Sequence, residues 1–167
     1  MKLFNTKEQI ATVDVVLLTK DNQQYSLSPN TTDTIEFEHI VKVMIDDVGN
    51  KENKSWENLG LFLTADTTFE KLQDLIINGD NTPLIFYIKQ FTDGRVFSLI
   101  RHCRQKGYQG QIIIIGQFAA DQAGYFVKSG ASGFVVADGQ ADTLTLTLKD
   151  LQTAHVGLSA NQLPMFR

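Results

Sequence analysis

Two patterns of hydrophobic and polar positions follow one another along the chain. In the first third, short apolar runs and strict alternation predominate, as in Val13 to Leu18, Tyr25 to Leu27 and the stretch from Ile35 to Ile45. Alternation with a period of two is typical of half-buried strands, and the polar residues between the first two runs favour a hairpin. The first third is therefore predicted to be rich in β-structure.

The rest of the chain repeats short apolar runs, each followed by an amphipathic stretch. Strands are predicted at residues 59–63, 84–88, 111–115 and 134–137. The first helix is predicted to begin with a capping box of Thr67 and Glu70 and to end at Gly79. Further helices are predicted at 93–106, 119–129 and 142–155. The last stretch also alternates like a strand, and we choose a helix because it completes the repeating order.

Strands that alternate with helices of this length imply crossover connections and a parallel sheet covered on both faces. We therefore predict an α/β fold, with a parallel sheet of about four strands and crossover helices in the order βαβαβαβα, preceded by a β-rich N-terminal section. Residues 1–55 would form that section and an exposed connector, packed on the same domain. Residues 56–155 would form the α/β domain, and residues 156–167 a C-terminal tail. The pattern leaves open whether the sheet is open or forms a partial barrel.

Composition excludes several classes of function. The chain of 167 residues has a formal net charge of -4, which provides no general attraction for nucleic acid. Cys103 is the only cysteine, so neither a disulfide framework nor a multi-cysteine metal site can form, and the three histidines show no ligand spacing. No apolar run approaches the roughly twenty residues of a membrane-spanning helix. We expect a cytoplasmic protein without a metal, nucleic-acid or membrane partner.

The polar residues of interest fall where predicted strands lead into helices. In a parallel sheet these loops lie at the carboxyl edge, where ligands usually bind. Asp93 is placed to cap the following helix, and Gly94 leaves room in its first turn. Arg95 and nearby backbone N–H groups would then hold a small anion such as phosphate, sulfite or a carboxylate. Asp121 and Gln122 begin the next helix, where Asp121 would either pair with Arg95 or share a polar pocket with it.

The helix after Arg95 carries a basic face. Arg95, Ser98 and His102 recur at helical spacing, and Arg101, Arg104 and Lys106 broaden that surface. The face is either solvated or docks an acidic partner. The candidate anion- or partner-binding residues are therefore Asp93, Gly94, Arg95, Ser98, Arg101, Asp121 and Gln122. No catalytic residue is predicted, because Cys103 lies on the apolar face of the helix and no dinucleotide, P-loop or nucleophile-elbow motif is present.

Several of these segments occur together in one known family. They are FTDGRVFSLIRHCR from Phe91, GYQG from Gly107, the Gly116 to Gln122 segment, Gly130 and Phe134. In this combination the chain resembles the domain of unknown function 934 family of small bacterial proteins. The resemblance matches Asp93, Gly94, Arg95, Ser98, Arg101, Tyr108, Asp121 and Gln122 to positions of the family motifs. Members often have a basic residue inside the third strand, where this chain has only Ile112 to Ile115.

The resemblance implies a pathway more than a reaction, because the family is described as oxidoreductases or accessory proteins of sulfite reduction. It implies an uncharacterised accessory protein of bacterial sulfite reduction and sulfur assimilation, which binds sulfite reductase or a small anion at the carboxyl edge. The alternative is an oxidoreductase with a flavin or nicotinamide cofactor at the same edge. A homodimer formed through the basic helix face is a third interpretation.

Overall fold

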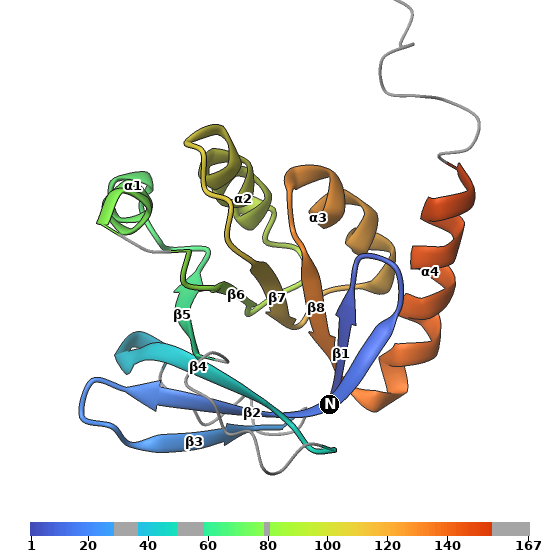
Figure 1. Ribbon diagram of the computed structural model, residues 1–167, viewed down its shortest axis with the longest axis horizontal. Coiled ribbons are helices and arrows are strands. Elements are labelled where there is room, and N and C mark those ends of the chain that lie inside the picture. The colour runs from blue at the N-terminus through green and yellow to red at the C-terminus, as the bar shows by residue number, and fades with distance from the viewer. Residues whose placement is uncertain (29–36, 50–58, 79–80, 155–167) are drawn as a thin grey trace, which may run out of the picture.

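The computed structural model describes residues 1–28, 37–49, 59–78 and 81–154, whose strands form one curved sheet with helices along one side (Figure 1). The strands are β1 (Lys2–Asn5), β2 (Gln9–Thr19), β3 (Gln24–Leu27), β4 (Ile40–Asp47), β5 (Leu59–Thr64), β6 (Leu84–Ile88), β7 (Ile112–Gly116) and β8 (Gly133–Val136). The helices are α1 (Phe69–Asn78), α2 (Arg95–Gln105), α3 (Ala123–Ser129) and α4 (Ala141–Ala154). Short 3₁₀ turns lie at Phe37–His39, Ala120–Gln122 and Asp138–Gln140. None of the helices in these ranges is long and apolar enough to cross a membrane.

The sheet closes on itself to form a barrel. Among the described strands the ring runs β1, β8, β7, β6, β5, β4, β2 and back to β1, and β3 pairs with β2 outside the ring. Closure depends on β2, which has 11 residues and is long enough to pair with three neighbouring strands. Its first half pairs with β1 and its second half with β3 along the same edge, while β4 occupies the other edge. The ring is completed by β1 and β8, in which Phe4 lies opposite Phe134.

The fold class predicted from the sequence is wrong. Strands β5 to β8 do pair parallel, but the other described pairings are all antiparallel, and the whole is a closed mixed barrel rather than a parallel α/β sheet. Helices α1 to α4 lie on one side of these strands only (Figure 1). The reason is that the N-terminal strands curl round to cover the second face, which further helices would cover in a doubly wound sheet.

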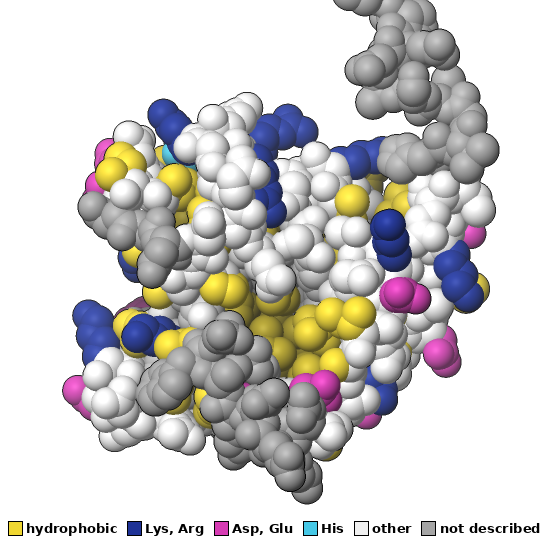
Figure 2. Space-filling view, in the orientation of Figure 1, with side chains coloured by type: hydrophobic (Ala, Val, Ile, Leu, Met, Phe, Trp, Pro, Cys, Tyr) yellow, Lys and Arg dark blue, Asp and Glu magenta, His cyan; other side chains and the backbone are white. Residues whose placement is uncertain are grey.

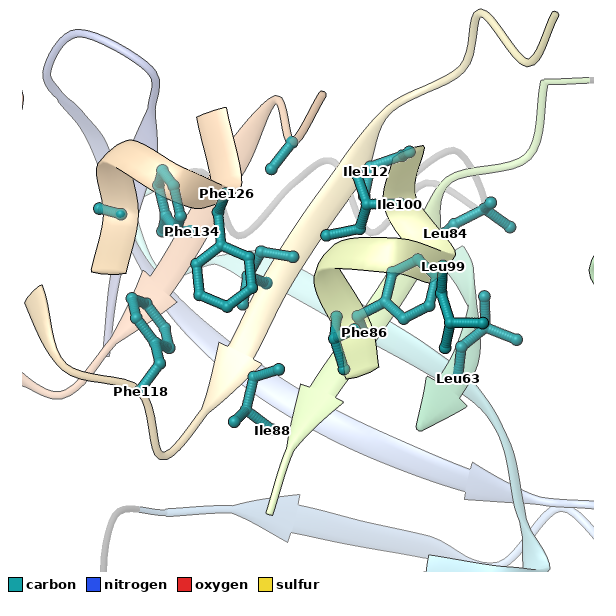
Figure 3. Packing of buried hydrophobic residues seen from close by; sticks show 14 of the residues in the cluster. Leu63, Leu84, Phe86, Ile88, Leu99, Ile100, Ile112, Phe118, Phe126 and Phe134 are labelled. Carbon is teal, nitrogen blue, oxygen red and sulfur yellow. The ribbon is translucent and has the colours of Figure 1, made fainter. Parts of the chain in front are cut away.

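Side chains of the parallel strands alternate between two hydrophobic clusters. Outward-pointing residues such as Leu84, Phe86 and Ile112 pack beneath the helices (Figure 3). Inward-pointing residues such as Ile85 and Tyr87 fill the barrel together with residues of β2 and β4. Burial on both faces explains why these strands are apolar throughout, since every position contacts one cluster or the other.

Individual elements lie close to their predicted positions, with some corrections. The helix at 142–155 is present as α4, and the predicted hairpin is formed by β2 and β3. The predicted capping box of Thr67 and Glu70 is wrong: Thr68 caps the helix by accepting the backbone N–H of Lys71 at 3.2 Å, whereas Thr67 accepts that of Thr64 at 3.1 Å. The alternating stretch before β4 includes a 3₁₀ turn, and β1 was not predicted at all. Predictions for Gly79, His155 and the tail at 156–167 lie outside the described residues.

Candidate functional site

Arg95 is held by carboxylates from two loops at the carboxyl edge. Its Nε and Nη2 donate to Asp93 at 3.0 and 2.7 Å, and its Nη1 donates to Asp66 at 2.8 Å. Hydrogen bonds from Arg95 hold the pKa of Asp93 below its usual range, and both carboxylates raise the pKa of Arg95. Arg95 and Asp66 are exposed and Asp93 is half-buried, and the three groups have a net negative charge, so an added anion would meet repulsion there.

Asp93 also stabilises the start of α2. Its Oδ1 accepts the backbone N–H of Arg95, the first helical residue, at 3.1 Å, while Gly94 occupies the N-cap position. The predicted steric role of Gly94 is wrong, because its φ of -79° is ordinary and an added Cβ would lie 3.8 Å from the nearest atom, in Phe97. Packing therefore does not require a glycine at position 94, where the backbone at the start of the helix is exposed.

The ion pair predicted between Arg95 and Asp121 does not form, since Arg95 turns towards Asp66 instead. An amide joins the two loops in its place. Gln122 donates from Nε2 to the carbonyl of Phe91 at 2.8 Å, and its Oε1 accepts the N–H of Ala119 at 3.1 Å. Gln122 thus ties the loop after β7 to the loop after β6, whereas Asp121 lies exposed beside it.

The remaining candidates lie along α2. Ser98 and Arg101 are exposed, but His102 packs its ring against Phe69 of α1, with 4.7 Å between the centroids. Cys103 is fully buried, which confirms its predicted place in the core, and burial raises the pKa of its thiol to about 11. The structure brings Asp93 and Arg95 together but leaves Ser98 and Arg101 outside their hydrogen-bond network.

Arg104 has a structural role at the opposite edge of the sheet. Its guanidinium donates to the carbonyl oxygens of Gly130, Tyr108 and Gly110 at 2.8 to 2.9 Å. It also lies over the Tyr108 ring, whose hydroxyl donates to the carbonyl of Thr82 at 2.5 Å. A Cβ on Gly110 would clash with Tyr108, and one on Gly130 would clash with Arg104. The GYQG segment and Gly130 therefore form a packed turn rather than a ligand site.

A pocket of about 450 Å³ opens at the carboxyl ends of β6, β7 and β8. Figure 2 shows a hollow with hydrophobic side chains between the helical layer and the lower strands. The lining residues are Met1, Leu27, Ser28, Tyr87, Phe91, Gly116, Gln117, Phe118, Ala119, Ala137 and Gln140. The sequence pointed to the two loops that form one wall but not to Phe91 and Phe118 as the residues that line it. Their position immediately after strand ends was the available signal.

The fold and site define a mixed barrel protein with parallel strands under a layer of helices and a pocket at their carboxyl ends. The chain belongs to the family described as "Bacterial protein of unknown function (DUF934)", whose model matches residues 60–166. The match confirms the family resemblance seen in the motifs. No curated protein and no solved structure matches the chain.

Proposed function

We propose that this protein is an accessory protein of bacterial sulfite reduction that binds the sulfite-reducing enzyme at the carboxyl edge of its parallel strands. One observation supports the location above others. The two family segments 91–95 and 116–122 meet at this edge through the hydrogen bond from Gln122 to Phe91. The third segment, GYQG, is accounted for by packing at the other edge. The pathway is what the family resemblance implies.

The exposed side chains at this edge suit a protein partner better than a small anion. Phe91 is 61% exposed, although its carbonyl is fixed by Gln122. Aromatic and arginine side chains are enriched where proteins bind one another, and a preordered arginine loses less conformational entropy on binding. Asp66 and Asp93 hold Arg95 in this way while repelling free anions. The edge therefore offers an aromatic contact beside a fixed, charged pair.

The alternative of a flavin or nicotinamide enzyme receives less support from the pocket. FMN and NADPH carry phosphate groups, which proteins commonly bind with lysine, arginine or helix N-termini. Among the described residues that line the pocket there is no lysine or arginine, and the helical N-termini at Ala119 and Ala137 belong to short 3₁₀ turns. We therefore propose a binding function and no redox reaction.

The proposal is tested by co-purification of sulfite reductase with the tagged chain from a bacterial extract. We expect wild-type protein to retain the enzyme, and Phe91→Ala and Arg95→Ala each to reduce binding by about tenfold or more, as central interface residues do. Tyr25→Ala, which removes an exposed aromatic side chain from β3, is the matched control. Absence of the enzyme, or equal retention by all variants, would sink the proposal.

A further inference from the structure

The walls of the carboxyl-edge pocket contain three aromatic rings from different elements. Tyr87 belongs to β6, Phe91 to the loop after it, and Phe118 to the loop after β7. Tyr87 and Phe118 are almost completely buried, at 2% and 3% exposure, so their rings are held by the two hydrophobic clusters. Rings that are already fixed lose little freedom when a ligand packs on them. The pocket is therefore preformed on its aromatic side.

Small residues leave space beside these rings. Gly116 has a φ of +100°, and a Cβ there would clash with the backbone of Ile88 and lie 3.0 Å from the Tyr87 ring. The N–H of Gln117 fixes the same backbone by donating to the Ile88 carbonyl at 2.7 Å. Ala119 and Ala137 complete the small residues of the lining. The glycine keeps the loop after β7 close to β6, and the alanines keep the adjacent space open.

The polar side chains of the pocket are neutral. Among the described lining residues they are Ser28, Tyr87, Gln117 and Gln140, and none is a carboxylate, a lysine, an arginine or a histidine. The amino group of Met1 donates to the carbonyl of Val13 at 3.1 Å and pairs with Asp138 at 3.8 Å. A charged ligand would lose hydration in such a pocket without gaining a side chain of opposite charge. Hydroxyl and amide groups instead match ligands with neutral hydrogen-bonding atoms.

We propose that this pocket is a binding site for a small, uncharged, planar aromatic molecule. Its volume lies within the usual range for small-molecule sites, and its position at the carboxyl ends of parallel strands is where such sites commonly occur. The ring would pack against Phe91, which is largely exposed, and one neutral polar atom would face the amide of Gln140. The pocket shares Phe91 with the edge proposed for the partner protein, but its test uses small probes alone, so the two proposals can fail separately.

The experiment uses three probes that share one ring system and differ in charge: indole, indole-3-acetate and tryptamine. Each is titrated into the purified chain while amide shifts are followed by ¹H–¹⁵N NMR. We expect indole to shift the amides of residues 116–119 and 137–140 with a dissociation constant on the order of 1 mM, as its size allows. Both charged homologues should bind at least about tenfold more weakly, because the pocket does not pair their charge.

Two substitutions that fill the pocket show whether indole occupies it. Gln140→Trp places a large side chain at an exposed lining position, and Gln105→Trp at an exposed position outside the pocket is its control. Ala119→Leu is a second, smaller filling change. Weaker indole binding in either pocket variant, with the control unchanged, supports the site. The proposal is overturned if indole shifts no amides at several millimolar, shifts them elsewhere, binds no better than its charged homologues, or binds both pocket variants as it binds wild type.

Discussion

Two arginines of the same helix have different roles. Arg95 begins α2 and is exposed beside two carboxylates, whereas Arg104 lies near its end and is half-buried under three carbonyl oxygens. Both occur in the FTDGRVFSLIRHCR segment, and the sequence alone predicted one basic surface for them. Solvent screens the exposed ion pairs of Arg95, so these pairs add little to stability. The hydrogen bonds of Arg104 are partly buried, and breaking them leaves carbonyl oxygens unpaired, which lowers stability.

Replacing Arg104 should therefore reduce stability. We expect Arg104→Ala to lower the free energy of unfolding by about 2–3 kcal/mol, since it removes charge-assisted hydrogen bonds to three carbonyl oxygens. Arg101→Ala, an exposed change on the same helix, should stay within about 0.5 kcal/mol of wild type. Urea unfolding followed by circular dichroism measures both. Equal stabilities would contradict a structural role for Arg104.

The buried thiol of Cys103 makes stability depend on pH in the alkaline range. Its folded pKa is about 11, above the ordinary value of 9.0, so the unfolded chain releases this proton first as pH rises. Between these values the folded state binds more protons than the unfolded state, and the free energy of unfolding falls. The Tm should therefore fall less steeply from pH 9 to 11 in Cys103→Ala than in wild type. Tyr108, whose pKa is raised to about 12 mainly by burial, makes both proteins less stable in the same pH range. Parallel Tm curves would show that the thiol is not shielded as described.

At the scale of elements, the strands and helices of residues 59–154 could be predicted because the pattern of apolar residues within each segment is enough to identify it. Apolar runs such as Leu84 to Ile88 bury both faces, and the stripe of α2 through Val96, Leu99 and Cys103 has helical spacing. The signal is weak for β1, which has four residues; it pairs with the next strand, β2, and with β8, which is distant in sequence. Barrel closure depends on the distant pairing with β8, so local periodicity could not reveal it.

The candidate site was partly predictable for the same reason. Chain order placed Asp93, Arg95 and Gln122 on loops at the carboxyl edge, where the structure has them. Which neighbour each side chain contacts depends on the angle between loops, and here Asp66 rather than Asp121 is within reach of Arg95. The pocket needed three-dimensional information, because Leu27 and Ser28 come from β3 and the residue after it.

The role of β1 is tested by its one buried ring. Phe4 is fully buried at the junction of β1 with β8, so Phe4→Ala should lower the free energy of unfolding by about 3–5 kcal/mol. Phe91→Ala, which truncates a mostly exposed ring, should change it by less than about 1 kcal/mol. Thermal or urea unfolding of both variants makes the comparison. A small cost for Phe4→Ala would mean that β1 does not close the barrel.

At the scale of the whole molecule, the barrel combines strands that the family model matches with N-terminal strands that it does not match. The match begins at residue 60 and so includes nearly all of β5, the later parallel strands and all the helices. The strands β1 to β4 precede it and close the ring. The carboxyl-edge pocket has lining residues from both parts. The matched segments provide one wall and the edge proposed for the partner, and the N-terminal strands provide the facing wall.

The most direct test of the central claim is the dissociation constant between the purified chain and sulfite reductase, measured for wild type, Phe91→Ala and Tyr25→Ala. We expect wild type and Tyr25→Ala to bind alike, and Phe91→Ala to bind about tenfold or more weakly while keeping its wild-type Tm. Binding by Phe91→Ala that equals wild type, or no binding by wild type, would contradict a partner-binding role for the carboxyl edge.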